Sequence, residues 1–139
     1  MTRKEVHNIL DRPRRISVRI KKLLSERQAL VDSLMPGGMD TNDRVQKTPE
    51  DVMARVIAEV ADIDEEIARL QAERIFTLTE LRKLLEGDDV RLAVVSMSYL
   101  AQMPMRDIAA EVHYSLKSVY RLRGEGLDMR GERYDDKGS

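Results

Sequence analysis

The chain has 139 residues, enough for one domain or for a small domain with an extended arm. Charged residues make up 35% of the chain and aromatic residues only 4%, which favours helices and coiled coils over a β-sandwich or barrel. The absence of cysteine excludes disulfides and thiolate metal sites. No stretch approaches the ~20 apolar residues of a membrane span, and the first ten residues lack the apolar run of a signal peptide. We therefore expect an all-α cytoplasmic protein with no membrane partner.

The net charge of −1 is made of two segments with opposite signs. Residues 1–27 carry nine Lys or Arg against three acids, a net charge of +6. Residues 40–90 carry fourteen acids against seven bases, a net charge of −7. Opposite charges on two neighbouring segments most simply indicate that the segments pack together. Contact between DNA and the basic cluster at residues 12–22 is the second interpretation, and the sequence leaves both open.

Two helices are predicted before residue 36. The first covers residues 2–11, where Val6, Ile9 and Leu10 share one side. The second covers about residues 14–35, and its apolar residues recur at spacings of three and four, which defines a heptad seam. The seam consists of Ile16, Ile20, Leu23, Leu30 and Leu34, with Arg27 as a basic interruption. The Pro-Gly-Gly sequence that follows breaks any helix, so residues 36–48 are predicted to form a connection.

A long helix is predicted from Pro49 to about Glu86. Thr48 is a good N-cap, and proline is favoured at the first helical position. Its seam is predicted at Val56, Val60, Ile63, Ile67 and Leu70, and then at Ile75, Leu78, Leu81 and Leu85. The stripe rotates around the helix between these two sets, which indicates a change of packing partner. At about 1.5 Å per residue the rod is about 57 Å long, against about 33 Å for the helix before it. The remaining length must contact the C-terminal domain or another subunit.

Residues 1–86 are therefore expected to form a long antiparallel helical hairpin that acts as a coiled-coil oligomerisation arm. Two helices alone bury too little apolar surface to be secure, so we favour a homo-oligomer, and a homodimer first. Val52 and Ile57 lie off the main seam and offer a second interface. A monomeric bundle of three or four helices is the alternative.

Residues 87–129 are predicted to form a helix-turn-helix domain, and the polar residues 130–139 a disordered tail. An apolar helix over about residues 90–102 would support the motif. Two further helices then meet at His113-Tyr114-Ser115, with the small Ala109 where they cross. The apolar pairs Ile108/Val112 and Val119/Leu122 are spaced to face a common core. In such motifs the second helix enters a DNA major groove.

The outward side of that second helix is the predicted site. With Val119 and Leu122 turned inward, the outward side chains are Lys117, Ser118, Tyr120 and Arg121. Lys117 and Arg121 share a face, so either can reach guanine acceptors in the groove. We predict that bases are read by Lys117, Tyr120 and Arg121, and that phosphates are held by Ser115, Arg106 and Arg123. An amphipathic helix pair with no ligand is the alternative.

The segment Asp88–Leu127 resembles region four of bacterial sigma factors. The matching residues are Ile108-Ala109, Tyr114-Ser115, Val119, Arg121-Leu122 and Gly124-x-x-Leu127. The whole chain is similar in plan to small phage and prophage proteins, such as late transcriptional regulators of the ArpU/RinA type. The resemblance implies promoter-type binding of double-stranded DNA at the nucleoid of a bacterial host cell, and RNA polymerase as a further partner. The family usually has Gly in the turn, where His113 stands here; histidine tolerates φ > 0 at a cost of about 1 kcal/mol.

No enzyme, cofactor or metal site is predicted. His7 and His113 are the only histidines, and neither has the spacing of a metal ligand. The acidic residues 62–66 point around a helix and are expected to form a solvated flank. Neither a Ser-His-Asp set nor a nucleophile elbow is present.

Two other functions stay open beside a phage-type transcriptional regulator. One is a small terminase-like DNA-packaging subunit, which would assemble as a ring of many copies. The other is an RNA polymerase-binding protein that does not itself bind DNA, an interpretation favoured by the mild charge of the C-terminal segment.

Overall fold

The computed structural model describes residues 1–34 and 49–138, with side chains through Glu132. Its elements are α1 (Arg3–Leu10), α2 (Arg12–Asp32), α3 (Pro49–Leu84), α4 (Val90–Tyr99), α5 (Met105–Val112) and α6 (Leu116–Gly138). Within these ranges the chain is helical and contains no strand, so the predicted all-α class is confirmed. The predicted connection at residues 36–48 and the N-cap Thr48 lie outside the described residues. None of the described helices is long and apolar enough to cross a membrane.

The chain divides into two compact units, which we describe separately. Unit 1 combines Met1–Arg15 with Arg74–Ser139, and unit 2 is Ile16–Glu73. Although the first helix was predicted to belong to the arm at residues 1–86, α1 belongs to the unit that contains α4, α5 and α6. The reason is its small apolar face: Val6 and Leu10 are buried against residues of α4 and α6.

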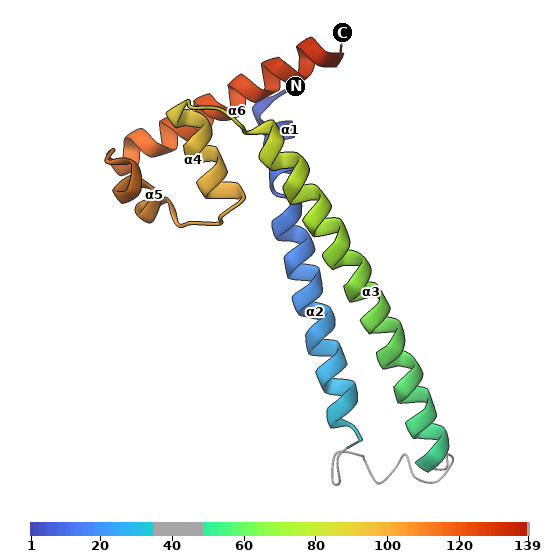
Figure 1. Ribbon diagram of the computed structural model, residues 1–139. Helices are drawn as coiled ribbons and strands as arrows, with labels where there is room; N and C mark the ends of the chain where they lie inside the picture. Colours follow the sequence, from blue (N-terminus) through green and yellow to red (C-terminus); the bar gives the residue numbers. More distant parts are fainter. Residues whose placement is uncertain (35–48, 139) are drawn as a thin grey trace. The chain divides into compact units, whose positions relative to one another are not determined.

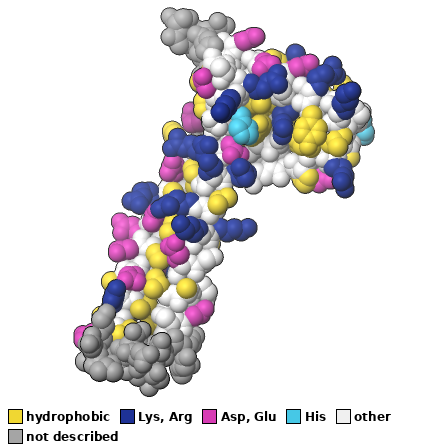
Figure 2. Space-filling view, turned by 180° about the vertical axis from the view of Figure 1, so that it is seen from behind, with side chains coloured by type: hydrophobic (Ala, Val, Ile, Leu, Met, Phe, Trp, Pro, Cys, Tyr) yellow, Lys and Arg dark blue, Asp and Glu magenta, His cyan; other side chains and the backbone are white. Residues whose placement is uncertain are grey.

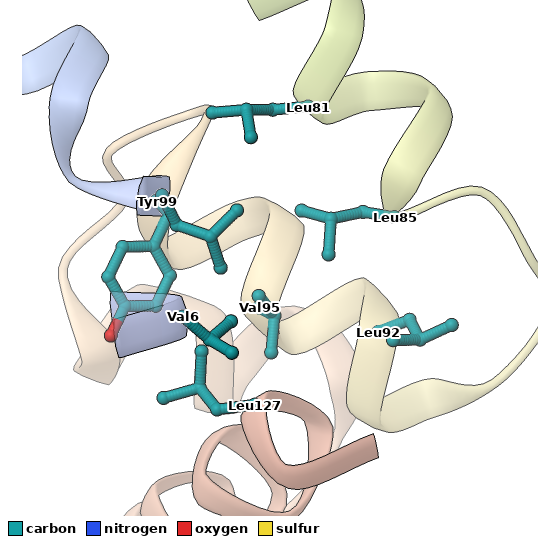
Figure 3. Packing of buried hydrophobic residues seen from close by; sticks show 8 residues of the cluster. Val6, Leu81, Leu85, Leu92, Val95, Tyr99 and Leu127 are labelled. Atoms are coloured by element: carbon teal, nitrogen blue, oxygen red, sulfur yellow. The ribbon is translucent and has the colours of Figure 1, made fainter. Parts of the chain in front are cut away.

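Unit 1 has a core built from four helices (Figure 3). Its buried members are Val6, Leu10, Leu81, Leu85, Leu92, Val95, Tyr99 and Leu127. Leu81 and Leu85, at the end of α3, therefore pack against α1, α4 and α6. This bears out the prediction that the seam of the long helix changes its partner. Ile75, which was assigned to the same stripe, is instead 62% exposed.

The last helix is longer than predicted. Residues 130–139 were predicted to form a disordered tail, whereas α6 continues to Gly138. Gly124 and Gly126 lie within this helix, and Gly126 allows another helix to approach closely. A Cβ atom on Gly126 would lie 2.6 Å from Cγ2 of Val95 and 2.8 Å from the carbonyl oxygen of Arg91. Gly126 is therefore the place where α4 crosses α6 at short range.

Unit 2 contains α2 from Ile16 onward and α3 up to Glu73, and these two segments lie side by side and run in opposite directions (Figure 1). Ile16, Ile20, Leu23 and Ile67 form its buried core, with Ile63 and Leu70 packed against them. Two ion pairs join the helices: Nη2 of Arg19 lies 2.6 Å from Oε1 of Glu66, and Nε of Arg27 lies 2.7 Å from Oδ1 of Asp64. The basic α2 thus packs on the acidic α3, as its charge predicted, and Arg27 interrupts the seam because it reaches sideways to Asp64.

Candidate nucleic-acid interface

The candidate site begins at the corner between α5 and α6. His113 adopts a left-handed conformation with φ 62° and ψ 39°, and its N–H donates to the carbonyl of Ala109. The N–H of Tyr114 donates to the same carbonyl at 3.1 Å. A left-handed turn is therefore present between α5 and α6, and His113 adopts the positive φ expected of it.

A small core holds the two helices at this corner. Val94 from α4, Ile108 and Ala109 from α5, and Val119 and Leu122 from α6 are buried together. Val94, Ile108 and Val119 have no exposed surface, so they position the helices by close packing. Each inward residue that the sequence analysis assigned here is confirmed, except that Val112 is half-buried at the margin of the cluster.

Ser115 is the N-cap of α6. Its hydroxyl oxygen accepts a hydrogen bond from the N–H of Ser118 at 3.2 Å, and the hydroxyl donates to Oγ of Ser118 at 2.8 Å. Ser118 was predicted to face outward, but it is half-buried and its polar groups bind Ser115. Capping at this position satisfies one of the N–H groups that the first helical turn leaves unpaired. The two hydroxyls therefore fix the start of α6.

The outer side of α6 carries both basic and apolar groups. Lys117 and Arg121 are exposed, as predicted, and they follow one another by one helical turn. Tyr120 is 50% exposed and Leu116 is 46% exposed, and these two residues are also four apart. On the face of unit 1 shown in Figure 2, Lys and Arg side chains surround exposed apolar side chains. The outer face of α6, meaning Leu116, Lys117, Tyr120 and Arg121, thus combines charge with apolar contact area.

Arg123 occupies a different position from the one predicted for a phosphate ligand. It is half-buried, and its Nη1 donates to Oγ of Ser98 at 3.4 Å. Its Cζ lies 5.9 Å from the ring centroid of Tyr99 and 5.2 Å from that of Tyr120. A guanidinium at these distances from two aromatic faces is held by cation–π attraction. Arg123 therefore orients Tyr120 and ties it to α4.

Burial raises the pKa of the Tyr99 hydroxyl, and the nearby positive charge of Arg123 offsets part of that rise. The same hydroxyl is hydrogen-bonded to Nδ1 of His7 at 2.7 Å. Tyr99 thus links α1, α4 and Arg123 in one contact chain. Arg106, the remaining predicted phosphate ligand, is exposed in the first turn of α5.

Three residues at or near the outer face of α6 are not among the predicted site residues. Tyr114 (45% exposed) and Leu116 add apolar surface at the start of α6. The spacing of Leu116 and Tyr120, four residues apart and beside the buried residues Val119 and Leu122, was the available signal. Arg3 could not be found from the sequence because it reaches α6 from α1. Its guanidinium lies over Gly124, and its Nε donates to Oδ1 of Asp128 at 3.0 Å. This bond lowers the pKa of the Asp128 carboxyl.

No family model, curated protein or solved structure matches the chain. Among the described residues, no group of three or more His, Cys, Asp or Glu is placed to hold a metal ion.

Proposed function

We propose that this chain is a sequence-specific double-stranded DNA-binding protein, of the phage transcriptional regulator type, in which α5 and α6 act as a helix-turn-helix. The observation that supports it most directly is the outer face of α6. Two exposed basic side chains and two exposed apolar ones stand on a helix whose other side is buried. A helix of this kind suits a major groove, which offers hydrogen-bond acceptors, thymine methyl groups and flanking phosphates.

Each side chain of the outer face has a specific role in this proposal. Lys117 and Arg121 donate to the N7 and O6 acceptors of guanine, Arg121 in bidentate fashion. Leu116 and Tyr120 contact thymine methyl groups. Arg106 and the first-turn N–H groups of α6 hold phosphates, because a helix N-terminus favours an anion. Arg123 acts as a positioning residue for Tyr120, since its guanidinium is occupied by two aromatic rings and Ser98.

The second candidate is an RNA polymerase-binding protein that does not touch DNA. Three exposed apolar side chains, Tyr114, Leu116 and Tyr120, lie within seven residues and favour a protein partner. The dependence of binding on salt concentration distinguishes the two candidate functions. Duplex binding through several phosphates weakens steeply as salt increases, whereas an apolar protein contact does not.

The test begins with selection of bound duplexes from a random pool, followed by affinity measurements at several salt concentrations. Arg121→Ala should weaken binding to the selected site by about 1–3 kcal/mol and relax the preference at one base pair. Arg55→Ala is the matched control, because it removes the same charge from an exposed position on α3 in unit 2. If no duplex is selected, or if Arg121→Ala binds like the parent, the proposed reading face is wrong.

A further inference from the structure

The side of α6 that carries Lys117 and Arg121 continues for two further helical turns. Gly124 and Asp128 follow Arg121 at spacings of three and four, so these residues stand on the same side of the helix. Lys117, Arg121 and Asp128 are exposed, but Gly124 is buried. A residue on an exposed side of a helix is buried only if another part of the chain covers it.

Arg3 of α1 is the residue that covers this position. Its Nε donates to Oδ1 of Asp128 at 3.0 Å, and its Nη2 donates to Oδ2 at 2.5 Å. Its guanidinium lies over Gly124, where a Cβ atom would be 2.8 Å from Nη1 and 3.0 Å from Cζ. Glycine at position 124 therefore leaves the room that the guanidinium needs in order to bind Asp128 in this geometry.

The ion pair uses only part of the guanidinium. Arginine has five N–H donors, and the bonds to Asp128 engage those of Nε and one of Nη2. No bond within the described residues engages Nη1, and the Arg3 side chain is 57% exposed. The carboxylate thus fixes the orientation of a guanidinium that still has donors for a second, anionic partner.

Stability does not explain this arrangement. An exposed ion pair adds little to the free energy of folding, and glycine within a helix lowers helix stability relative to alanine. Other contacts hold α1 in place: Val6 and Leu10 are buried in the core, and Nδ1 of His7 is hydrogen-bonded to the hydroxyl of Tyr99. A cation that is oriented at a cost in helix stability is typical of a binding site.

The place of the guanidinium along α6 indicates which anion it would meet. Gly124 follows Lys117 by seven residues, which is about 10 Å along the helix at ~1.5 Å per residue. In a helix-turn-helix the N-terminal residues of the second helix contact base edges. The major groove is about 12 Å wide and is bordered by phosphates. With Lys117 and Arg121 at the bases, a cation over Gly124 is close to the phosphates at the border of the groove.

We propose that Arg3 is a phosphate-binding residue of the DNA interface, in which Asp128 and Gly124 hold its guanidinium while Nη1 donates to a phosphate oxygen of the duplex. Asp128 is then a positioning residue, and its ion pair with Arg3 keeps its charge from repelling the DNA. The contact adds affinity without reading a base, because phosphates carry no sequence information directly. This inference rests on the proposed DNA binding of α6 and extends the interface to α1.

The experiment measures the affinity of the full chain for the selected duplex and for an unrelated duplex at several salt concentrations. Arg3→Ala should weaken binding to both by about fivefold to tenfold and reduce the slope of log affinity against log salt by about 1. The base preference should stay unchanged, in contrast to that of Arg121→Ala. Arg55→Ala is the control, because it removes an exposed, ion-paired arginine from unit 2, and it should change neither quantity.

Two further variants separate a direct phosphate contact from mere neutralisation of Asp128. Gly124→Ala keeps every charge but displaces the guanidinium, so it should weaken binding to both duplexes by about threefold or more. The double variant Arg3→Ala/Asp128→Asn removes both members of the ion pair. It should bind more weakly than Asp128→Asn alone, because the phosphate contact is lost even when no carboxylate needs to be neutralised.

Two results would overturn the inference. One is a Gly124→Ala variant that binds both duplexes like the parent, and the other is a double variant that binds as tightly as Asp128→Asn. Circular dichroism checks that each variant is folded, and if Arg3→Ala unfolds, Gly124→Ala decides. If Arg121→Ala weakens binding but Arg3→Ala does not, the outer face of α6 is supported and only the role of Arg3 is wrong. A parent that binds no duplex would instead refute the proposed function itself.

Discussion

Units 1 and 2 are both helical, but they bury their apolar residues to different extents. In unit 1, Val6, Leu10, Val94, Val95, Ile108 and Val119 retain at most 1% of their surface. In unit 2 the best-buried residues of α2 and α3 keep 5–8%. Val18, Leu24, Met53 and Ile57 of unit 2 are about half exposed. Several helices can surround a side chain, whereas two helices cover it from one direction only.

This difference shows whether each unit encloses its own apolar core. Unit 1 closes its own core and can hold the outer face of α6 at a set angle. Unit 2 leaves several apolar side chains open to solvent, because two helices alone cannot enclose a core. Experiments that weaken either core therefore test the contrast directly.

The largest effect is expected in the core of unit 1. Ile108→Ala leaves a cavity in a fully enclosed site, so it should lower the free energy of unfolding by about 3–5 kcal/mol. Ile67→Ala removes the same atoms from unit 2, where neighbouring side chains can relax into the space, and should cost about 2 kcal/mol or less. Denaturant unfolding combined with amide hydrogen exchange measures each unit separately. Equal losses would mean that the two cores are equally closed.

A second pair of variants tests close packing within one helix. On helix propensity alone, a glycine replaced by alanine stabilises a helix by about 1 kcal/mol. Gly126→Ala should instead destabilise unit 1 by about 1–3 kcal/mol, because the new methyl meets Val95 and the backbone of Arg91. At Gly124 the obstacle is the movable guanidinium of Arg3, so Gly124→Ala should be neutral or stabilising. Thermal unfolding of both variants checks this; stabilisation by Gly126→Ala would contradict the close crossing of α4 and α6.

The smallest effect concerns pH and a surface cap of unit 1. Oδ1 of Asp89 accepts from the backbone N–H of Arg91 at 2.8 Å, and Oδ2 accepts from Nη2 at 2.8 Å. These bonds lower the pKa of Asp89 from 3.8 to about 2. A carboxyl whose pKa is lower in the folded state stabilises the fold above its unfolded pKa. That contribution is lost as the pH falls from about 4 to about 2.

Asp89→Asn keeps a residue that can cap α4 but removes this charge. The stability difference between parent and variant should therefore shrink as the pH falls from about 5 to about 2. Asp88→Asn is the control, since it removes an adjacent carboxylate and leaves the bonds to Arg91 in place. A difference between parent and Asp89→Asn that does not change with pH would exclude the ionised cap.

Periodicity along the sequence was enough to predict most helices and the inward residues of α5 and α6. Apolar residues spaced by three and four must share a side of a helix, whatever surrounds it. The same reasoning placed Lys117 and Arg121 on the exposed side and the left-handed turn at His113. Charge composition likewise predicted that α2 packs on α3, because opposite net charges on adjacent helices attract.

Only the tertiary structure decided which elements meet. The contacts of Arg3 with Gly124 and Asp128, and of His7 with Tyr99, join residues about a hundred positions apart, and no local pattern encodes such pairs. The close approach at Gly126 could not be predicted, since a sequence alone does not show that another backbone lies against this residue. Arg123 was read as a free cation for the same reason. Local periodicity determines which side of a helix a side chain occupies, and long-range packing determines which other residues it contacts.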